Sequence, residues 1–201
     1  MKLTWKGKYN NERQLSIGNI PDNAVKFKGA ENPNRLMLES SLYIILSIII
    51  IAIFVYLKRK MNPEINLSLS FNLWGVMLGF LFIIPHELLH AIAVPKNADV
   101  QIWYSAKNIM PFTYFNCTNS KLRFIFICLL PNAILGIIPF IVWTFTEFNS
   151  VEFSKTLFTF SAFNILIGCG DFYHVYRVIT QMPNNAFVQF SRFSLYWYPR
   201  K

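Results

Sequence analysis

Residues 71–94 read FNLWGVMLGFLFIIPHELLHAIAV, a stretch that is apolar enough to cross a bilayer. It nevertheless contains His86, Glu87 and His90. On a helix, two histidines four residues apart project from one face and can bind one Zn²⁺ ion, with the glutamate placed to take a proton from bound water. Ionisable groups inside a membrane cost about 2.5 kcal/mol or more each, so they persist mainly where they function or are paired. This HExxH pattern predicts a hydrolytic zinc site in a membrane-spanning helix; the alternative is two histidines satisfied by helix packing.

The composition indicates a membrane protein. The chain is 54% hydrophobic and 14% charged, and its apolar residues come in blocks. Four blocks are present, at residues 41–57, 71–94, 122–148 and 157–179. The first has only 17 residues, which is the lower limit for crossing a hydrocarbon core of about 30 Å. We therefore predict an all-α polytopic protein of the cell membrane with about four transmembrane helices.

The regions that flank these blocks are polar. Residues 1–40 are expected to form a small cytosolic segment, residues 41–180 the metallopeptidase-like membrane domain, and residues 181–201 a cytosolic tail. Because the first apolar block starts so late, no cleavable signal peptide is expected. Within the first segment, Leu3 to Tyr9 and Ala24 to Phe27 have the composition of short strands.

The net charge of +9 is distributed as in a membrane protein. With four spans and a cytosolic N-terminus, cytosolic segments hold 15 Lys or Arg residues and external segments hold four. This positive-inside pattern places both termini in the cytosol, although the cluster Lys58-Arg59-Lys60 falls on the other side. The basic surface is expected to attract anionic lipid headgroups rather than nucleic acid.

A β-hairpin is predicted between the second and third helices. Residues 100–104 and 112–117 are aromatic and β-branched, and the turn-like segment Lys107 to Pro111 separates them. If this membrane-associated hairpin dips toward the site, it can pair with an extended substrate by adding a strand. The alternative is a surface loop.

A hydrolytic zinc site requires a third protein ligand, with one position left for water. The second and fourth spans run in the same direction, and His86 lies 15 residues into one while Asp171 lies about 14 into the other. At about 1.5 Å per residue, both are about 20 Å from the outer end. Asp171 is therefore our choice of third ligand, and His174, which follows at i+3, is the rival. Asn132 reaches a similar depth, where it can brace a ligand, contact the substrate or bond to another helix.

Two prolines are expected to disturb the spans. Pro85, immediately before His86, removes a helical hydrogen bond and should kink the second span, leaving carbonyls unpaired beside a wet pocket. Pro131 should have a similar effect in the third span.

Several motifs together resemble a domain-of-unknown-function family of small bacterial membrane proteins described as putative zincin peptidases, and the resemblance covers nearly the whole chain. The motifs are MKLTWKGK (1–8), NAVKFK (23–28), PHELLHA (85–91), YSAKN (104–108), SKLRFIF (120–126), PN (131–132), GDFYHVY (170–176), MP (182–183) and YWY (196–198).

The layout also resembles that of site-2 proteases, whose HExxH lies in one membrane helix and whose third ligand is an Asp from a later helix. This similarity implies His86, His90 and Asp171 as zinc ligands and Glu87 as the catalytic base. One departure is that the site-2 protease Asp precedes a Gly, whereas here Gly170 precedes Asp171.

The expected function is that of an intramembrane zinc metallopeptidase, which hydrolyses membrane-embedded or membrane-proximal peptides. The alternative is a non-proteolytic scaffold or binding protein that retains the zinc-binding fold, but an intact Glu87 beside both histidines argues against it. A metal transporter would require several acidic or histidine sites along the bundle, and this chain has one such cluster.

Overall fold

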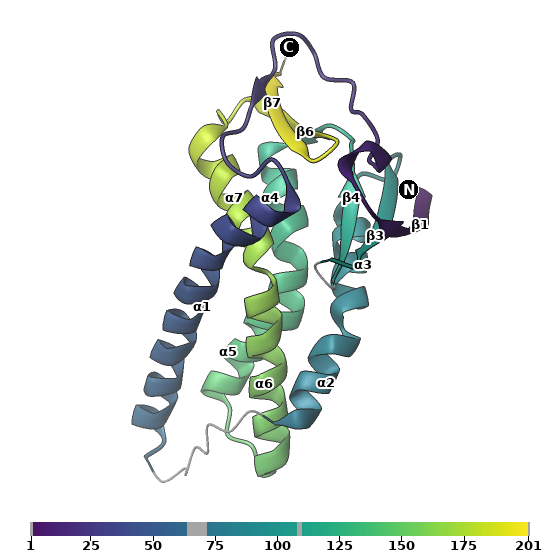
Figure 1. Cartoon of the computed structure of the whole chain (residues 1–201). Coiled ribbons are helices and arrows are strands. Elements are labelled where there is room, and N and C mark those ends of the chain that lie inside the picture. The colour runs from purple at the N-terminus through teal and green to yellow at the C-terminus, as the bar shows by residue number, and fades with distance from the viewer. Residues whose placement is uncertain (1, 64–71, 108–109, 201) are drawn as a thin grey trace.

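The computed structural model describes residues 2–63, 72–107 and 110–200. Long helices form a bundle, two small β-sheets lie at one end of it, and both termini lie at that same end (Figure 1). The chain is therefore a mixture of helix and sheet, and the expectation of an all-α protein is wrong. The polar flanks that were expected to be a segment and a tail supply strands to these sheets.

The helices occupy most of the membrane-like sequence. They are α1 (Pro33–Met61), α2 (Leu73–Leu81), α3 (Ile83–Ala93), α4 (Lys121–Pro131), a π-helical segment η2 (Asn132–Ile137), α5 (Ile138–Phe145), α6 (Val151–Ile167) and α7 (Cys169–Gln181), with a short 3₁₀ turn η1 (Glu12–Gln14) near the N-terminus.

Three helical stretches within the described residues are long and apolar enough to cross a membrane: 33–61, 73–93 and 121–145. The fourth expected span is instead two helices, α6 with 17 residues and α7 with 13, which meet at Gly168. Polar side chains in α7, including Asp171 and Arg177, lower its hydropathy. The structure thus supports three of the four expected membrane helices by length and composition.

Helix α1 begins eight residues before the apolar block that predicted it. The side chain of Asn32 accepts a hydrogen bond from the Arg35 N–H, and Pro33 occupies the first helical position. Both features favour a helix start, because the first N–H groups of a helix lack intrahelical partners and proline has no N–H to satisfy.

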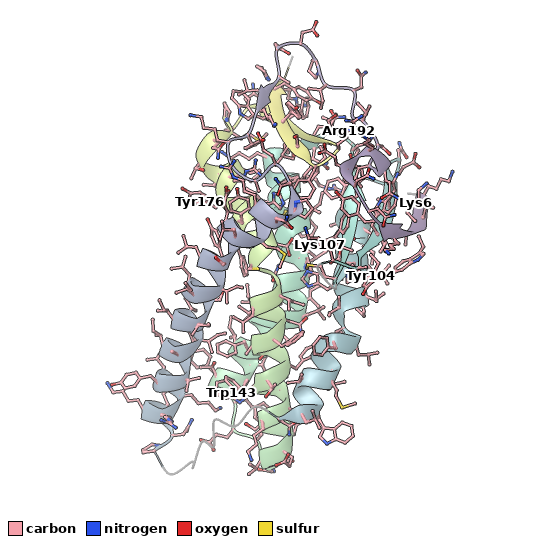
Figure 2. The ribbon with its side chains drawn as sticks, viewed as in Figure 1. Lys6, Tyr104, Lys107, Trp143, Tyr176 and Arg192 are labelled. Carbon is pink, nitrogen blue, oxygen red and sulfur yellow. The ribbon has the colours of Figure 1, made fainter. Side chains whose placement is uncertain are left out.

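The other end of α1 accounts for one residue, Lys58, of the basic cluster that did not fit the charge pattern. Lys58 is only 2% exposed. Its ammonium group donates to the Trp143 carbonyl and, at 2.9 Å, to the Thr146 carbonyl, at the C-terminus of α5. A cation at this position satisfies carbonyls that have no helical partner. Trp143 lies toward the end of the bundle that is remote from the sheets (Figure 2).

The first sheet contains the predicted hairpin. Its strand order is β1 (Lys2–Tyr9), β3 (Asp99–Ser105), β4 (Met110–Phe115), with β1 parallel and β4 antiparallel to β3. The hairpin and the strand near Leu3 to Tyr9 are thus confirmed. Within the predicted turn, residues 108–109 lie outside the described residues. Strand β4 is at an edge of this sheet.

The second sheet joins both ends of the chain. Its order is β2 (Val25–Lys26), β7 (Ser194–Pro199), β6 (Ala186–Ser191) and β5 (Asn119–Ser120), all antiparallel. The strand expected near Ala24 to Phe27 is confirmed as β2.

A buried apolar cluster joins the second sheet to the ends of α3, α4 and α7. Its most buried large side chains are those of Val100, Phe124, Ile127, Val178, Val188 and Leu195. Full burial of each such side chain contributes about 1.5–3 kcal/mol. This cluster therefore fixes the relative positions of the helices that carry the candidate site.

Candidate metal centre

Helix α3 carries His86, Glu87 and His90, which are 5%, 8% and 8% exposed. One potential ligand atom of each lies within 4.8 Å of those of the other two. The preceding helix ends at Leu81, and the helical path is interrupted at Phe82 before α3 begins. Pro85 explains the break, because it has no N–H for the Leu81 carbonyl and its ring crowds that carbonyl. The kink predicted at this proline is confirmed.

The neighbouring helix orients the ring of His90. The Nδ1 atom lies 2.8 Å from the carbonyl oxygen of Ile127. Because a carbonyl only accepts hydrogen bonds, Nδ1 carries a proton, and in the neutral ring Nε2 then offers its lone pair to a metal ion. Pro131 cannot donate to the Ile127 carbonyl four residues earlier, so this carbonyl is available to His90.

Asp171 on α7 faces both histidines. Its Oδ2 lies 3.3 Å from His86 Nε2, and its Oδ1 lies 3.3 Å from His90 Nε2. The structure thus brings together residues that are 85 positions apart in the chain. The side chain of Asp171 is 17% exposed, so water screens this arrangement only in part.

The donor set fits a zinc ion. His90 Nε2 and Asp171 Oδ1 face each other at 3.3 Å, and either a proton on Nε2 or a metal ion held by both atoms satisfies this contact. His86 Nδ1 is buried without a hydrogen-bond partner among the described residues, and His86 Nε2 faces Asp171 Oδ2. Imidazole nitrogen and carboxylate oxygen are ordinary zinc ligands. Glu87 is close enough to join the set, but it is the residue that a hydrolytic site keeps for proton transfer.

Asn132 braces Asp171. Its Nδ2 donates to Asp171 Oδ2 at 2.8 Å and to the Cys128 carbonyl at 3.3 Å, and the residue is fully buried. Asn132 was considered as a brace for a ligand, as a substrate contact or as a bond to another helix. The structure shows that it contacts the candidate ligand Asp171. Such contacts orient metal ligands, and their loss commonly lowers metal affinity by about 10–100-fold.

Gly168 supplies the space that Asn132 occupies. A Cβ atom at Gly168 would lie 1.6 Å from Asn132 Oδ1, whereas one at Gly170 would meet nothing within 4 Å. We expect Gly168→Ala to displace Asn132, lowering zinc affinity by about 10–100-fold and also lowering the melting temperature. Gly170→Ala is the matched control and should leave both unchanged. Zinc titration and thermal unfolding of the two variants check this, and equal zinc affinity in both would contradict it.

His174, the rival ligand, is partly buried and packs among aromatic rings. Its ring centroid lies 6.4 Å from that of Phe124 and 5.8 Å from those of Tyr173 and Phe190. Its Nδ1 atom has no hydrogen-bond partner among the described residues. Of the two rivals, Asp171 is therefore the one placed against both histidines.

The site opens into a mainly apolar cavity of about 570 Å³. Its walls include Met37 and Ile44 from α1, Phe112 from β4, Phe163 from α6 and Phe193 from the β6–β7 turn. Strand β4 runs along the site, because the Thr113 hydroxyl donates to the Glu87 carbonyl at 2.9 Å. The hairpin was considered either as an element that approaches the site or as a surface loop. The structure places its edge strand beside the candidate centre.

Sequence reasoning missed several parts of this site. The Ile127 carbonyl could have been found from Pro131, because proline leaves the carbonyl four residues earlier without a helical donor. The contacts of Thr113 and Gly168 have no local sequence signal, since both depend on helices and strands that are distant in the chain.

A family model described as "putative zincin peptidase" matches residues 79–187, which is more than half of the chain. The match includes the HExxH motif, Asn132 and Asp171. No curated protein and no solved structure matches the chain significantly.

Proposed function

The chain belongs to the putative zincin peptidase family, and on this premise we propose that it is a zinc metallopeptidase that cuts membrane-embedded or membrane-proximal peptides. The observation that carries the proposal is the meeting of His86, His90 and Asp171, one carboxylate oxygen facing each imidazole at 3.3 Å. This meeting occurs in an apolar cavity among helices, several of which are apolar enough to cross a bilayer.

In this proposal, His86, His90 and Asp171 hold the zinc ion. Three protein ligands leave a fourth position open, as hydrolytic zinc sites require. The chemistry that a bound zinc ion supplies at such a site is Lewis acidity toward a water molecule and a peptide carbonyl.

The protein's own groups then handle the proton and hold the geometry. Glu87 takes a proton from the attacking water and delivers it to the departing amine. The Thr113 hydroxyl holds the backbone of Glu87 against β4, and the Ile127 carbonyl holds His90 in the tautomer that presents Nε2. Asn132 keeps Asp171 turned toward the histidines.

We further propose that the substrate binds as an extended segment along the edge of β4. A helical amide is hidden by its own hydrogen bonds, whereas an extended segment exposes its amides and can pair with an edge strand. The aromatic and aliphatic walls of the cavity suit the apolar side chains of a peptide that leaves a membrane.

Cleavage by the purified protein tests this function. In detergent, with a mixture of synthetic single-span peptides, we expect defined products by mass spectrometry. A chelator such as 1,10-phenanthroline should abolish cleavage, and added zinc should restore it, because the ligands alone provide no Lewis acid. Uncleaved peptides after incubation with a zinc-loaded preparation would contradict the proposal.

The third ligand has its own test. Asp171→Ala should lower zinc affinity by more than the roughly 10–100-fold that loss of a bracing residue causes, because it removes a ligand and leaves two histidines. His174→Ala should leave zinc affinity near that of the unmodified protein, because the His174 ring packs among aromatic side chains. Competition titration with a zinc-binding dye measures the zinc affinity of both variants. A larger loss of affinity in His174→Ala than in Asp171→Ala would mean that the zinc ligands are three histidines.

A further inference from the structure

Arg192 occupies the turn that joins β6 to β7. Ser191 and Ser194 are paired, so Arg192 and Phe193 form a two-residue turn. The φ angle of Arg192 is +51°, and it is the one non-glycine residue with positive φ in the described chain. Glycine or asparagine is usual at such positions, and another residue there costs about 1–3 kcal/mol. An arginine kept at this cost suggests that its side chain has a function.

The guanidinium group of Arg192 has no protein partner within the described chain. Its Nε atom is buried without a hydrogen bond, and none of the ion pairs formed by described residues includes it. Of the described residues that line the cavity, Arg192 alone is a lysine or arginine. A partly buried cation without a counter-charge is unfavourable, so an anionic ligand would stabilise it.

The backbone of Arg192 is fixed beside the strand that borders the candidate centre. Its N–H donates to the Ser16 carbonyl at 3.1 Å, and the Tyr114 hydroxyl donates to the same carbonyl. Burial raises the pKa of Tyr114, so the hydroxyl remains a donor. Tyr114 follows Thr113, whose hydroxyl bonds to the Glu87 backbone. Arg192 thus lines the cavity, and it lies at the end of the molecule where the sheets are (Figure 2).

We propose that Arg192 binds a carboxylate of the peptide substrate, either an Asp or Glu side chain or a C-terminal carboxylate. This inference rests on the proposed peptidase function and specifies its substrate class. Guanidinium binds carboxylate through paired hydrogen bonds, and these are strong where water is largely excluded. A peptide extended along β4 would place the carboxylate a fixed number of residues from the bond that is cut. An anionic lipid headgroup would be a different ligand.

Binding of peptide hydroxamates to the zinc-loaded protein tests the inference without catalysis. The hydroxamate group chelates zinc. For each position of the peptide in turn, a pair of compounds is made that carries Glu or Gln at that position and is otherwise identical. At one position we expect the Glu compound to bind about tenfold more tightly, as expected for a charge-assisted hydrogen bond. C-terminal acids and amides are compared in the same way.

Variants separate binding from folding. Arg192→Asn suits positive φ, so it should keep the melting temperature or raise it while reducing the Glu to Gln preference to about one. Arg192→Lys should keep part of the preference, because it keeps the charge and loses the fork of donors. Arg13→Gln, at an exposed arginine outside the cavity, removes the same charge and should keep the full preference.

Several results would overturn the proposal that Arg192 binds a substrate carboxylate. A ratio near one at every position in the unmodified protein, or a ratio that survives Arg192→Asn, would overturn the inference and leave the zinc site intact. Loss of binding to phosphatidylglycerol vesicles in Arg192→Asn, without any peptide preference, would assign the arginine to lipid and also overturn it. Failure of every hydroxamate to bind would overturn the proposed peptidase site, and this inference with it.

Discussion

Replacing either histidine, in His86→Ala or His90→Ala, should reduce bound zinc from about one ion per chain to a trace. The two imidazoles lie on one face of α3, and each faces a different oxygen of Asp171. Removing one leaves a single imidazole and a carboxylate, too few ligands for a stable site. Elemental analysis of protein purified in detergent measures the loss.

The matched control for the histidine variants is His174→Ala. It removes a partly buried histidine from outside the proposed ligand set. We expect it to retain zinc, and thermal unfolding of all three variants should show folded protein. Full zinc content in His86→Ala or in His90→Ala would exclude the site proposed here.

The second large effect is expected for Glu87→Gln, which should retain zinc but lower peptide hydrolysis by about 10²–10⁴-fold. Glutamine has the shape of glutamate but cannot accept the proton of the attacking water. The hydrogen bond from Thr113 reaches the backbone carbonyl of residue 87, so the substitution leaves it in place. The measurement is the rate of peptide cleavage at equal zinc occupancy.

Glu12→Gln is the control for this change, because Glu12 is exposed in η1, outside the cavity. It should cleave at the rate of the unmodified protein. Cleavage at that same rate in Glu87→Gln would show that another residue moves the proton.

Local patterns were sufficient to predict the helix that carries the HExxH motif, the kink and the hairpin. The HExxH spacing and Pro85 act within one or two helical turns, and the alternating aromatic residues of the hairpin act within one pair of strands. These features depend on neighbours in the chain, so the sequence alone predicts them. The apolar blocks likewise predicted four membrane helices, and three helical stretches among the described residues are long and apolar enough to be such spans.

The predicted depth of Asp171 came only from residue counts along two helices. It placed Asp171 level with His86, but it could not say which faces of the helices meet. The structure supplies that information, since α7 turns Asp171 toward both histidines and Asn132 holds it there. Whether Asp171 binds zinc stays a prediction.

The sheets and the cavity were decided by contacts between distant parts of the chain. Strand β1 pairs with β3, and β2 pairs with β7. The polar ends of the chain, which composition had suggested were a separate segment and a tail, therefore complete two sheets. The charge of Lys58 is satisfied by carbonyls of α5, and Arg192 reaches the cavity from the last hairpin. Hydropathy and spacing predicted most of the long helices and the position of the candidate zinc ligands on α3. Only the tertiary structure decided the partners of the buried polar groups, because those partners come from elements far away in the sequence.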